Sequence, residues 1–319
     1  MSESDINPQW RLVRIGRGSF ASVSILSGRP VAFKHVIVRE RSAELKTEFE
    51  ALCSLYDFCV TDSFFGVPRP LAFYDPHKST SFLSAGPPKA RRRPLRSLVS
   101  EGDFKLLELD TAAYAMDQVL PIPLLTAKTI RTLFYPPNMP NASDPTLCRL
   151  YFGKVIKELG PGGRPNRFLN SANFPLDVSR YRKLLEVAVE GDCVYPSVED
   201  IAYGMGEMLG RLHWRAGYDG RDVEFVMGGV SFSGVAMYMI DFNQMRTWKR
   251  NPNEIQQLVD AFYTNDPYYP RPNPDDLLYK EFSDGYLDAH PKESRDAIDV
   301  GEAFLRAIED EQRRRISAN

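Results

Sequence analysis

The spacing of apolar residues changes part-way along the 319-residue chain. Up to about residue 120, apolar and polar residues alternate in short runs that are broken by glycines, a pattern typical of antiparallel strands. Beyond Pro123 the apolar residues recur every three or four positions, which is typical of amphipathic helices. We therefore predict a bilobal α+β protein, with a β-rich N-lobe over residues 1–120, a mainly helical C-lobe over residues 121–319, and a ligand cleft between the lobes.

Individual elements are predicted from the same pattern. In the N-lobe we expect three strands within residues 11–37, one amphipathic helix at 40–56, and further strands around 67–74 and 106–119. In the C-lobe we expect a strand pair at 223–229 and 235–242, and helices at 178–191, 198–214, 254–263 and 297–315. Residues 77–104 form an insert rich in Pro, Ser and Arg, which we predict to be a surface loop. Its arginines at positions 91–93 are interpreted as solvated rather than as a nucleic-acid site.

The composition argues against several classes of protein. With 40 Lys and Arg against 42 Asp and Glu, the formal charge is −2, which predicts neither a nucleic-acid partner nor a membrane partner. Four scattered cysteines without a C-x-x-C pair predict no disulfides and no zinc site. No apolar run reaches the roughly 18 residues of a membrane helix, and the acidic start lacks the features of a secretory signal. We expect a cytoplasmic or nuclear protein.

A glycine-containing turn lies between the first two expected strands. Because Gly16 and Gly18 lack Cβ atoms, the backbone N–H groups of this turn, including that of Ser19, would come close to a bound phosphate. An ordinary tight hairpin has the same pattern. The later strand V-A-F-K ends in Lys34, whose ammonium would neutralise phosphate charge, and the alternative for Lys34 is a surface strand residue.

An acidic partner for Lys34 is expected on the helix at 40–56, because an ammonium in a partly dry cleft needs a carboxylate to orient it. Glu48 is favoured, since it lies one turn before Leu52 on the helix face that packs on the sheet. Glu44 and Glu50 are the competitors for this role.

Acidic residues of the C-lobe complete the candidate site. Asp219 precedes Glu224 by five positions, and Glu224 opens an expected strand. In a loop of this D-x-x-x-x-N type, here with Glu for Asn, the Asp acts on the attacking hydroxyl and the residue five positions later binds a metal ion. Asp222 is the alternative to Asp219, and Asp241, directly after the second strand of the pair, is the other metal-ligand candidate. We interpret His213 as a structural histidine of the preceding helix.

With the motifs IGRGSFASV, VAFK, EFEAL, DGRDVEFVMG and IDFNQ, the chain resembles the protein kinase-like superfamily from about Leu12 to Gln244. The resemblance includes the aminoglycoside and choline phosphotransferases, and within the superfamily it is strongest to uncharacterised fungal proteins often labelled "zinc finger protein". It implies a bilobal kinase-like fold with ATP between the lobes. Carried over to this sequence, the resemblance implies that Gly16 and Gly18 cover the phosphates and that Lys34 and Glu48 form an ion pair. It implies an adenine-side hinge at Met116 to Val119. It also implies that Asp219 is the catalytic Asp and that Glu224 and Asp241 hold Mg²⁺.

Some positions depart from that pattern. Ala21 replaces the third glycine of the loop, Tyr218 stands where such kinases have Arg or Gly, and Glu224 adds a negative charge beside the triphosphate. No activation loop follows Asp241. We therefore expect an enzyme that transfers a phosphoryl group from ATP, with Mg²⁺, to a small hydroxylated metabolite.

Two alternatives remain open at this point. In the first, the fold has lost phosphoryl transfer and binds, cyclises or rearranges an apolar natural-product intermediate of secondary metabolism. In the second, the chain is a pseudokinase scaffold that binds another protein.

Overall fold

The computed structural model describes residues 11–85, 99–136, 142–157, 173–188, 194–230, 234–264 and 268–318. Contacts within the chain divide it into two compact units. The first comprises Met1–Cys53 and Pro68–Val119, and the second comprises Ser54–Val67 and Leu120–Asn319. Residues 54–67, which we expected in the N-lobe, are therefore part of the second unit.

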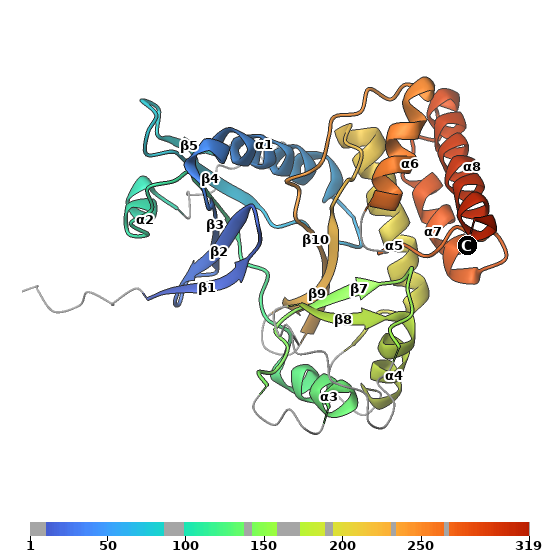
Figure 1. Ribbon diagram of the computed structural model, residues 1–319, viewed down its shortest axis with the longest axis horizontal. Coiled ribbons are helices and arrows are strands. Elements are labelled where there is room, and N and C mark those ends of the chain that lie inside the picture. Colours follow the sequence, from blue (N-terminus) through green and yellow to red (C-terminus); the bar gives the residue numbers. More distant parts are fainter. Residues whose placement is uncertain are drawn as a thin grey trace, which may run out of the picture. The chain divides into compact units, whose positions relative to one another are not determined.

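A six-stranded antiparallel sheet forms the centre of the first unit (Figure 1). Its strands have the spatial order β1-β2-β3-β6-β4-β5. Their bounds are β1 (Leu12–Arg17), β2 (Ala21–Leu26), β3 (Val31–Val36), β4 (Pro70–Tyr74), β5 (Phe82–Ser84) and β6 (Ala113–Asp117). The alternating pattern of residues 11–37 gives the three predicted strands, and Gly28, with a φ of +84°, makes the turn between β2 and β3.

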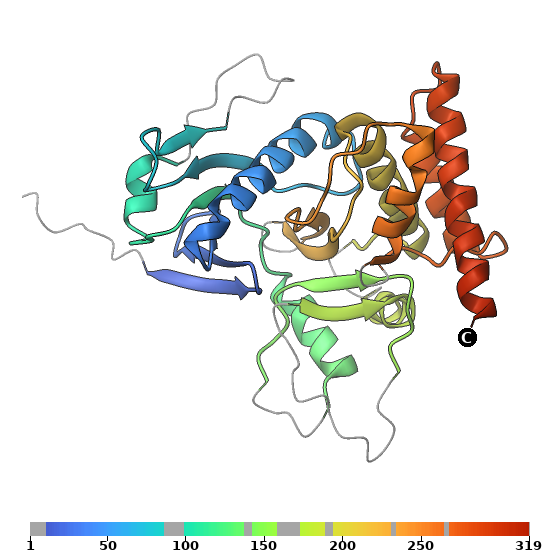
Figure 2. The same ribbon diagram turned by 45° about the horizontal axis from the view of Figure 1, so that its top comes forward.

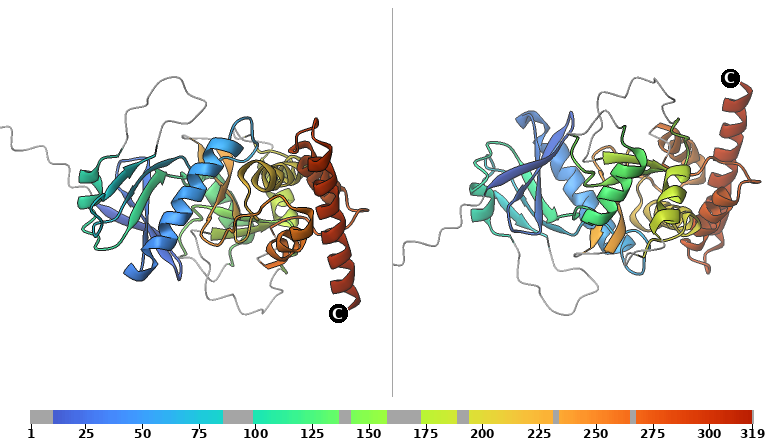
Figure 3. Two further views of the ribbon diagram at one scale, coloured as in Figure 1. Left: turned by 90° about the horizontal axis from the view of Figure 1, so that it is seen from above. Right: turned by 90° about the horizontal axis from the view of Figure 1, so that it is seen from below.

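Each face of this sheet packs against a helix. The helix α1 (Ser42–Cys59), which follows the short 3₁₀ turn η1 (Arg39–Arg41), lies along one face (Figure 3). Its Phe49 contacts Phe73 and Tyr114, with ring centroids 5.8 and 5.6 Å apart. On the other face, α2 (Glu101–Lys105) inserts Phe104, which is 1% exposed and meets Phe33 edge-on at 5.3 Å. Buried aromatic rings of this kind contribute much of the packing energy of a small core.

The second unit combines a four-stranded sheet with most of the helices (Figure 2). The sheet has the order β10-β9-β7-β8, formed by β7 (Cys148–Tyr151), β8 (Phe174–Asp177), β9 (Glu224–Val230) and β10 (Gly234–Ile240). Only the β7–β8 pairing is parallel among these described strands. The helices are α3 (Leu124–Phe134), α4 (Val178–Ala188), α5 (Val198–Arg211), α6 (Ile255–Thr264), α7 (Leu277–Asp288) and α8 (Arg295–Ser317), with the short turns η3 (Leu212–Ala216) and η4 (Pro252–Glu254).

Glycines of α5 and α7 set the distance between these two helices. A Cβ atom added to Gly206 would lie 1.9 Å from the Phe282 carbonyl oxygen, and one added to Gly285 would lie 2.1 Å from that of Tyr203. The backbones of the two helices therefore touch where each helix has a glycine. This contact fixes α5, the helix that precedes η3 and the loop of Asp219.

The structure is α+β, with an antiparallel sheet in the N-terminal part and mostly helices in the C-terminal part. Several local expectations were wrong. The insert at 77–104 contains β5 and α2, and the strand expected at 106–119 is confined to β6. The elements β7, β8, α3 and α7 were not predicted. The strands have four residues each, and the buried faces of the two helices mix apolar residues with Thr126, Gly285 and tyrosines, which weakens the apolar period.

In the described parts of the chain, no helix is long and apolar enough to cross a membrane. Within the described ranges, Cys53, Cys59 and Cys148 form no disulfide with one another. Cys193 and the arginines at 91–93 lie outside the described residues, so the interpretation of those arginines stays a prediction.

Candidate functional site

The turn between β1 and β2 holds the glycines singled out in the sequence. Gly18 N–H donates to the Ala21 carbonyl at 2.9 Å, and Gly16 pairs with Val23 across the two strands. Neither glycine has a positive φ, and an added Cβ would make its nearest contact at 3.7 Å for Gly16 and 3.8 Å for Gly18. The hairpin by itself therefore requires glycine at neither position. Ser19 is exposed at the turn.

Lys34 and Glu48 form a buried ion pair within the first unit. The Lys34 Nζ, from β3, lies 2.6 Å from the Glu48 Oε1, from α1, and the two side chains are 10% and 0% exposed. The Tyr114 hydroxyl donates to the same oxygen at 3.1 Å. Charge-assisted hydrogen bonds at this length are strong and directional in a poorly solvated site. The pair fixes the position of the Lys34 ammonium.

The competitors of Glu48 make different contacts. Glu44 lies 2.6 Å from Arg41 and Glu50 lies 3.5 Å from Lys46, and both of these pairs are at the surface. The 3.6-residue period of α1 accounts for this difference, because Glu48 shares a helix face with the buried Leu45 and Leu52. The structure thus joins Lys34 to the carboxylate that the period favours.

The strand register places the glycine turn and Lys34 on one face of the sheet. Gly16, Val23, Lys34 and Tyr114 stand directly opposite one another in successive strands, so they share a face. A parallel row on that face consists of Val13, Ile25, Ala32 and Met116. In that row Val13 is 36% exposed, and Ile25 and Met116 are partly exposed.

This face thus combines glycine backbone, one oriented ammonium and partly open apolar side chains. Such a set suits a ligand that carries phosphate at one end and a flat apolar group at the other. Met116 belongs to the face through its pairing with Ala32, whereas Val119 is the last residue of the first unit and follows β6. All of these residues belong to the first unit.

In the second unit, Asp219 lies in the loop after α5 and η3. Its carboxylate is 0% exposed. One oxygen accepts from the backbone N–H groups of Arg221 and Arg246, at 3.2 and 3.0 Å. The other accepts from Arg246 Nε at 2.6 Å and from Gln257 Nε2 at 3.1 Å. Four donors around one buried carboxylate are typical of a structural anion, whereas we expected an oxygen open to a substrate hydroxyl.

Asp222 and Asp241 lie close enough to influence each other. Both have a φ of +63°, a left-handed backbone that L side chains seldom adopt. Burial raises the pKa of Asp222, and the negative charge of Asp241 raises it further, against opposing effects of Gln244, Arg221 and Arg149. Gln244 donates its side-chain N–H to Asp222. A half-buried carboxyl with a raised pKa is a common environment for proton transfer.

Glu224, at the start of β9, is held by an arginine of the neighbouring strand. Its Oε1 lies 2.6 Å from Arg149 Nη2 on β7. Among the described residues, no group of three or more His, Cys, Asp or Glu side chains is placed to hold a metal ion. Glu224 therefore does not fit the Mg²⁺ role that we expected, because its carboxylate already neutralises a guanidinium.

His213 lies in the packed interior, as a structural histidine does. Its Nδ1 is 3.0 Å from the Tyr286 hydroxyl and its Nε2 is 3.3 Å from the backbone oxygen of Asp219. The ring meets Phe304 edge-on at 5.1 Å. Burial lowers the pKa of His213 to about 3, so the ring is neutral and supports the Asp219 loop.

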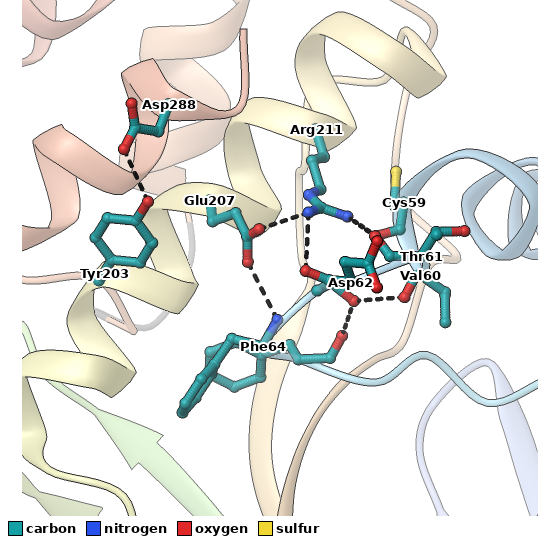
Figure 4. Close-up of polar contacts among 11 residues, drawn as sticks. Cys59, Val60, Thr61, Asp62, Phe64, Tyr203, Glu207, Arg211 and Asp288 are labelled. Atoms are coloured by element: carbon teal, nitrogen blue, oxygen red, sulfur yellow. Dashed lines mark hydrogen bonds and ion pairs between the residues drawn. The ribbon is translucent and has the colours of Figure 1, made fainter.

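Arg211 is a further buried cation of the second unit that no sequence motif singles out (Figure 4). Its guanidinium donates to the carbonyls of Cys59, Thr61 and Asp62, and it lies 2.6 Å from Glu207. The other Glu207 oxygen accepts from Phe64 N–H at 3.1 Å. One ion pair thus fixes the segment directly after α1 against α5. A lone Arg at a helix end carries no motif, so only the packing identifies it.

A family model described as "Zinc finger protein" matches residues 237–296. The match covers less than a fifth of the chain, from β10 to the start of α8. No curated protein matches the chain. The resemblance to the protein kinase-like superfamily that we predicted from the sequence motifs is therefore wrong, since the family model that matches is a different one. The matched segment contains no cysteine and one histidine, His290, so it lacks the Cys and His pattern of a zinc finger.

Proposed function

We propose that the chain is an ATP-dependent phosphotransferase that moves a phosphoryl group to a small hydroxylated metabolite. The observation that carries this proposal is the buried Lys34–Glu48 ion pair, on the sheet face that also holds the glycine turn. The proposal rests on these residues and not on membership of a family. The finer fold expectation, a two-lobed phosphotransferase, is part of the same proposal.

The ammonium is the group that would contact the ligand. A lysine held by one carboxylate keeps its position without the entropy cost of ordering a free side chain, so it is prepared to neutralise phosphate charge. Gly16 and Gly18 would let the turn close on the phosphates, and the row from Val13 to Met116 would contact the base.

In the proposed reaction, the substrate hydroxyl oxygen bonds to the γ-phosphorus while the bond from that phosphorus to the β–γ bridging oxygen breaks. ADP leaves, and the hydroxyl proton passes to a carboxylate. We assign this carboxylate to Asp222 rather than Asp219, because Asp219 already accepts four hydrogen bonds. A Mg²⁺ ion bound to the nucleotide would neutralise phosphate charge, and Asp241 is the residue that would hold it, since Mg²⁺ bound to phosphates needs only one or two carboxylates.

A second candidate function is supported by the contacts of Asp219 and Glu224. Both carboxylates are committed to protein partners, which favours a protein that binds an apolar metabolite on the same face without phosphoryl transfer. The two candidates differ in whether ATP binds and whether ADP is released.

Calorimetric titration with ATP and thermal unfolding test the proposal on three variants. Lys34→Met removes the ammonium but leaves Glu48 buried without its partner, so this variant is expected to unfold more easily. Lys34→Met/Glu48→Leu removes both charges and is expected to keep the fold. Lys46→Met is the matched control, because Lys46 forms an exposed ion pair with Glu50 on α1, the helix that also holds Glu48.

ATP at about 100 times its Kd is expected to stabilise the wild type and Lys46→Met by about 2.7 kcal/mol, and the double variant not at all. Absence of binding by the wild type at millimolar ATP, or equal binding by the double variant, would overturn the proposal. If ATP binds but no ADP is released with any of a panel of hydroxylated metabolites, ATP binding stands and the proposed phosphoryl transfer is overturned.

A further inference from the structure

The sheet face opposite Lys34 bears a pocket of about 320 Å³. The pocket is lined by side chains of β1, β2 and β3 and by residues 108–111, which precede β6. The register assigns it to this face, since Arg17, Ser22 and His35 stand opposite one another, one position along from the row of Lys34. Its volume lies at the lower end of the range for small-molecule sites. Nothing in the proposed function uses it.

A β-bulge brings two arginines to this pocket. Arg14 and Arg17 are three positions apart, and in a regular strand that odd spacing would direct them to opposite faces. The register of β1 shifts between Arg14 and Gly16, so Arg14 pairs with Ser24 and Arg17 with Ser22, on the same face. Both side chains line the pocket. Bulges often re-aim side chains next to functional sites.

The arginines of this pocket form no ion pair with its acidic residues among the described contacts. Within the described part of the chain, neither Arg14 nor Arg17 takes part in an ion pair, although Glu108 and Asp110 line the same pocket. Because both arginines line one pocket from the same sheet face, an anion that both guanidiniums contact would be favourable there. Glu108 has a φ of +51°, an unusual backbone for a residue with a side chain, at the acidic side of the pocket.

Neutral polar groups complete the lining. Burial lowers the pKa of His35, so its ring is a hydrogen-bonding group rather than a third cation. The Ser22 and Thr111 hydroxyls also line the pocket and donate to the carbonyls of Gly16 and Val36, at 3.1 Å each. Val36, Ile37 and Leu109 add apolar surface, so the lining is mixed, with cationic groups on the strand side and acidic groups on the side of residues 108–111.

We propose that this pocket binds a small zwitterionic phosphate monoester, with its phosphate between Arg14 and Arg17 and its ammonium group toward Glu108. Planar guanidiniums bind phosphate with paired hydrogen bonds, which gives this group preference over a simple halide. The acidic side of the pocket gives an amine preference over an uncharged tail of equal size.

Calorimetry on the full chain tests this with two matched probes. Phosphoethanolamine carries both charges, and ethyl phosphate has the same phosphate without the ammonium. The wild type is expected to bind both saturably, with phosphoethanolamine several-fold tighter. Arg14→Gln and Arg17→Gln are each expected to weaken both probes by about tenfold or more, and Glu108→Gln is expected to remove the advantage of phosphoethanolamine alone.

Two variants serve as controls. Arg11→Gln changes an exposed arginine just before β1 that does not line the pocket, and Lys34→Met/Glu48→Leu alters the other sheet face. Both are expected to bind the probes as the wild type does. The proposal is overturned if neither probe saturates at millimolar concentrations, if Arg11→Gln weakens binding as much as Arg17→Gln, or if binding depends on Lys34 instead.

Discussion

Asp219 and Asp222 lie three positions apart, yet their carboxylates have different surroundings. Asp219 is buried and accepts four hydrogen bonds. Two come from the backbone N–H groups of Arg221 and Arg246, and two from the side chains of Arg246 and Gln257. Asp222 accepts from Gln244, is half-buried, and has a raised pKa because of burial and the charge of Asp241. An environment that saturates a carboxylate stabilises its charge, whereas one that raises the pKa prepares it to take up a proton.

The two aspartates are therefore expected to respond differently to replacement by asparagine. Asp219→Asn turns an amide N–H toward existing donors and should destabilise the fold by about 1–3 kcal/mol in urea unfolding. Asp222→Asn should change stability little but abolish ADP formation from ATP. The assignment of Asp222 fails if its Asn variant retains full turnover while Asp219→Asn is stable and inactive.

Arg211 is a stability residue by the same kind of argument. Replacing it with methionine leaves Glu207 and three backbone carbonyls without their donor, and breaking such a buried pair costs about 3–5 kcal/mol. Thermal and urea unfolding measure this loss. Arg215→Met, one turn further on and exposed, is the control and should behave as the wild type. Equal stability of the two variants would show that the guanidinium contacts contribute little.

At the scale of elements, the closest approach is between α5 and α7. Gly206→Ala would place a Cβ atom 1.9 Å from the Phe282 carbonyl oxygen, so the helices would have to move apart. We expect a loss of about 1–3 kcal/mol or more in urea unfolding, as for other overpacked cores. Gly102→Ala in α2, where the nearest contact is 3.5 Å, is the control and should be tolerated. If Gly206→Ala is equally stable, the two helices are not in fixed contact.

The sequence predicted helices and strands well where a periodic pattern of apolar residues continued over a long segment. The three strands at 11–37, α1, α5, α6, α8 and the β9–β10 pair all lie where alternation or a 3.6-residue period was visible. Short elements such as α2 were missed, because five residues contain hardly more than one turn. Its Phe104 is identified as core only by the contacts it makes across the sheet with Phe33.

For the whole molecule, buried histidines predict a loss of stability in acid. Burial lowers the pKa of His213 to about 3 and also lowers that of His290. In the unfolded chain the value is about 6.5, so between the two values the unfolded state binds more protons. The stability that the neutral, buried His213 contributes is complete above pH 6.5 and is lost as the pH falls toward 3.

Urea unfolding between pH 8 and pH 5 is the measurement. Below the unfolded pKa, stability should fall with a slope that approaches about 1.4 kcal/mol per pH unit for each such histidine. His213→Gln should reduce the slope, and the exposed His77→Gln should not. As an independent check, the His213 ring signals in NMR should stay those of a neutral ring down to pH 5. A titration of that ring near pH 6.5 would contradict the prediction.

Periods that repeat every two or 3.6 residues along the chain predict the α+β class, and they favour Glu48 over Glu44 and Glu50 as the partner of Lys34. No local pattern shows that Asp219 accepts from Arg246, 27 positions away, or that Arg211 donates to the Cys59 carbonyl, 152 positions away; both contacts follow from the packing of distant segments. The shared pocket of Arg14 and Arg17 likewise depends on a bulge that alternation does not reveal. A local pattern states which face a side chain occupies, whereas its hydrogen-bond partner is set by segments that packing brings together.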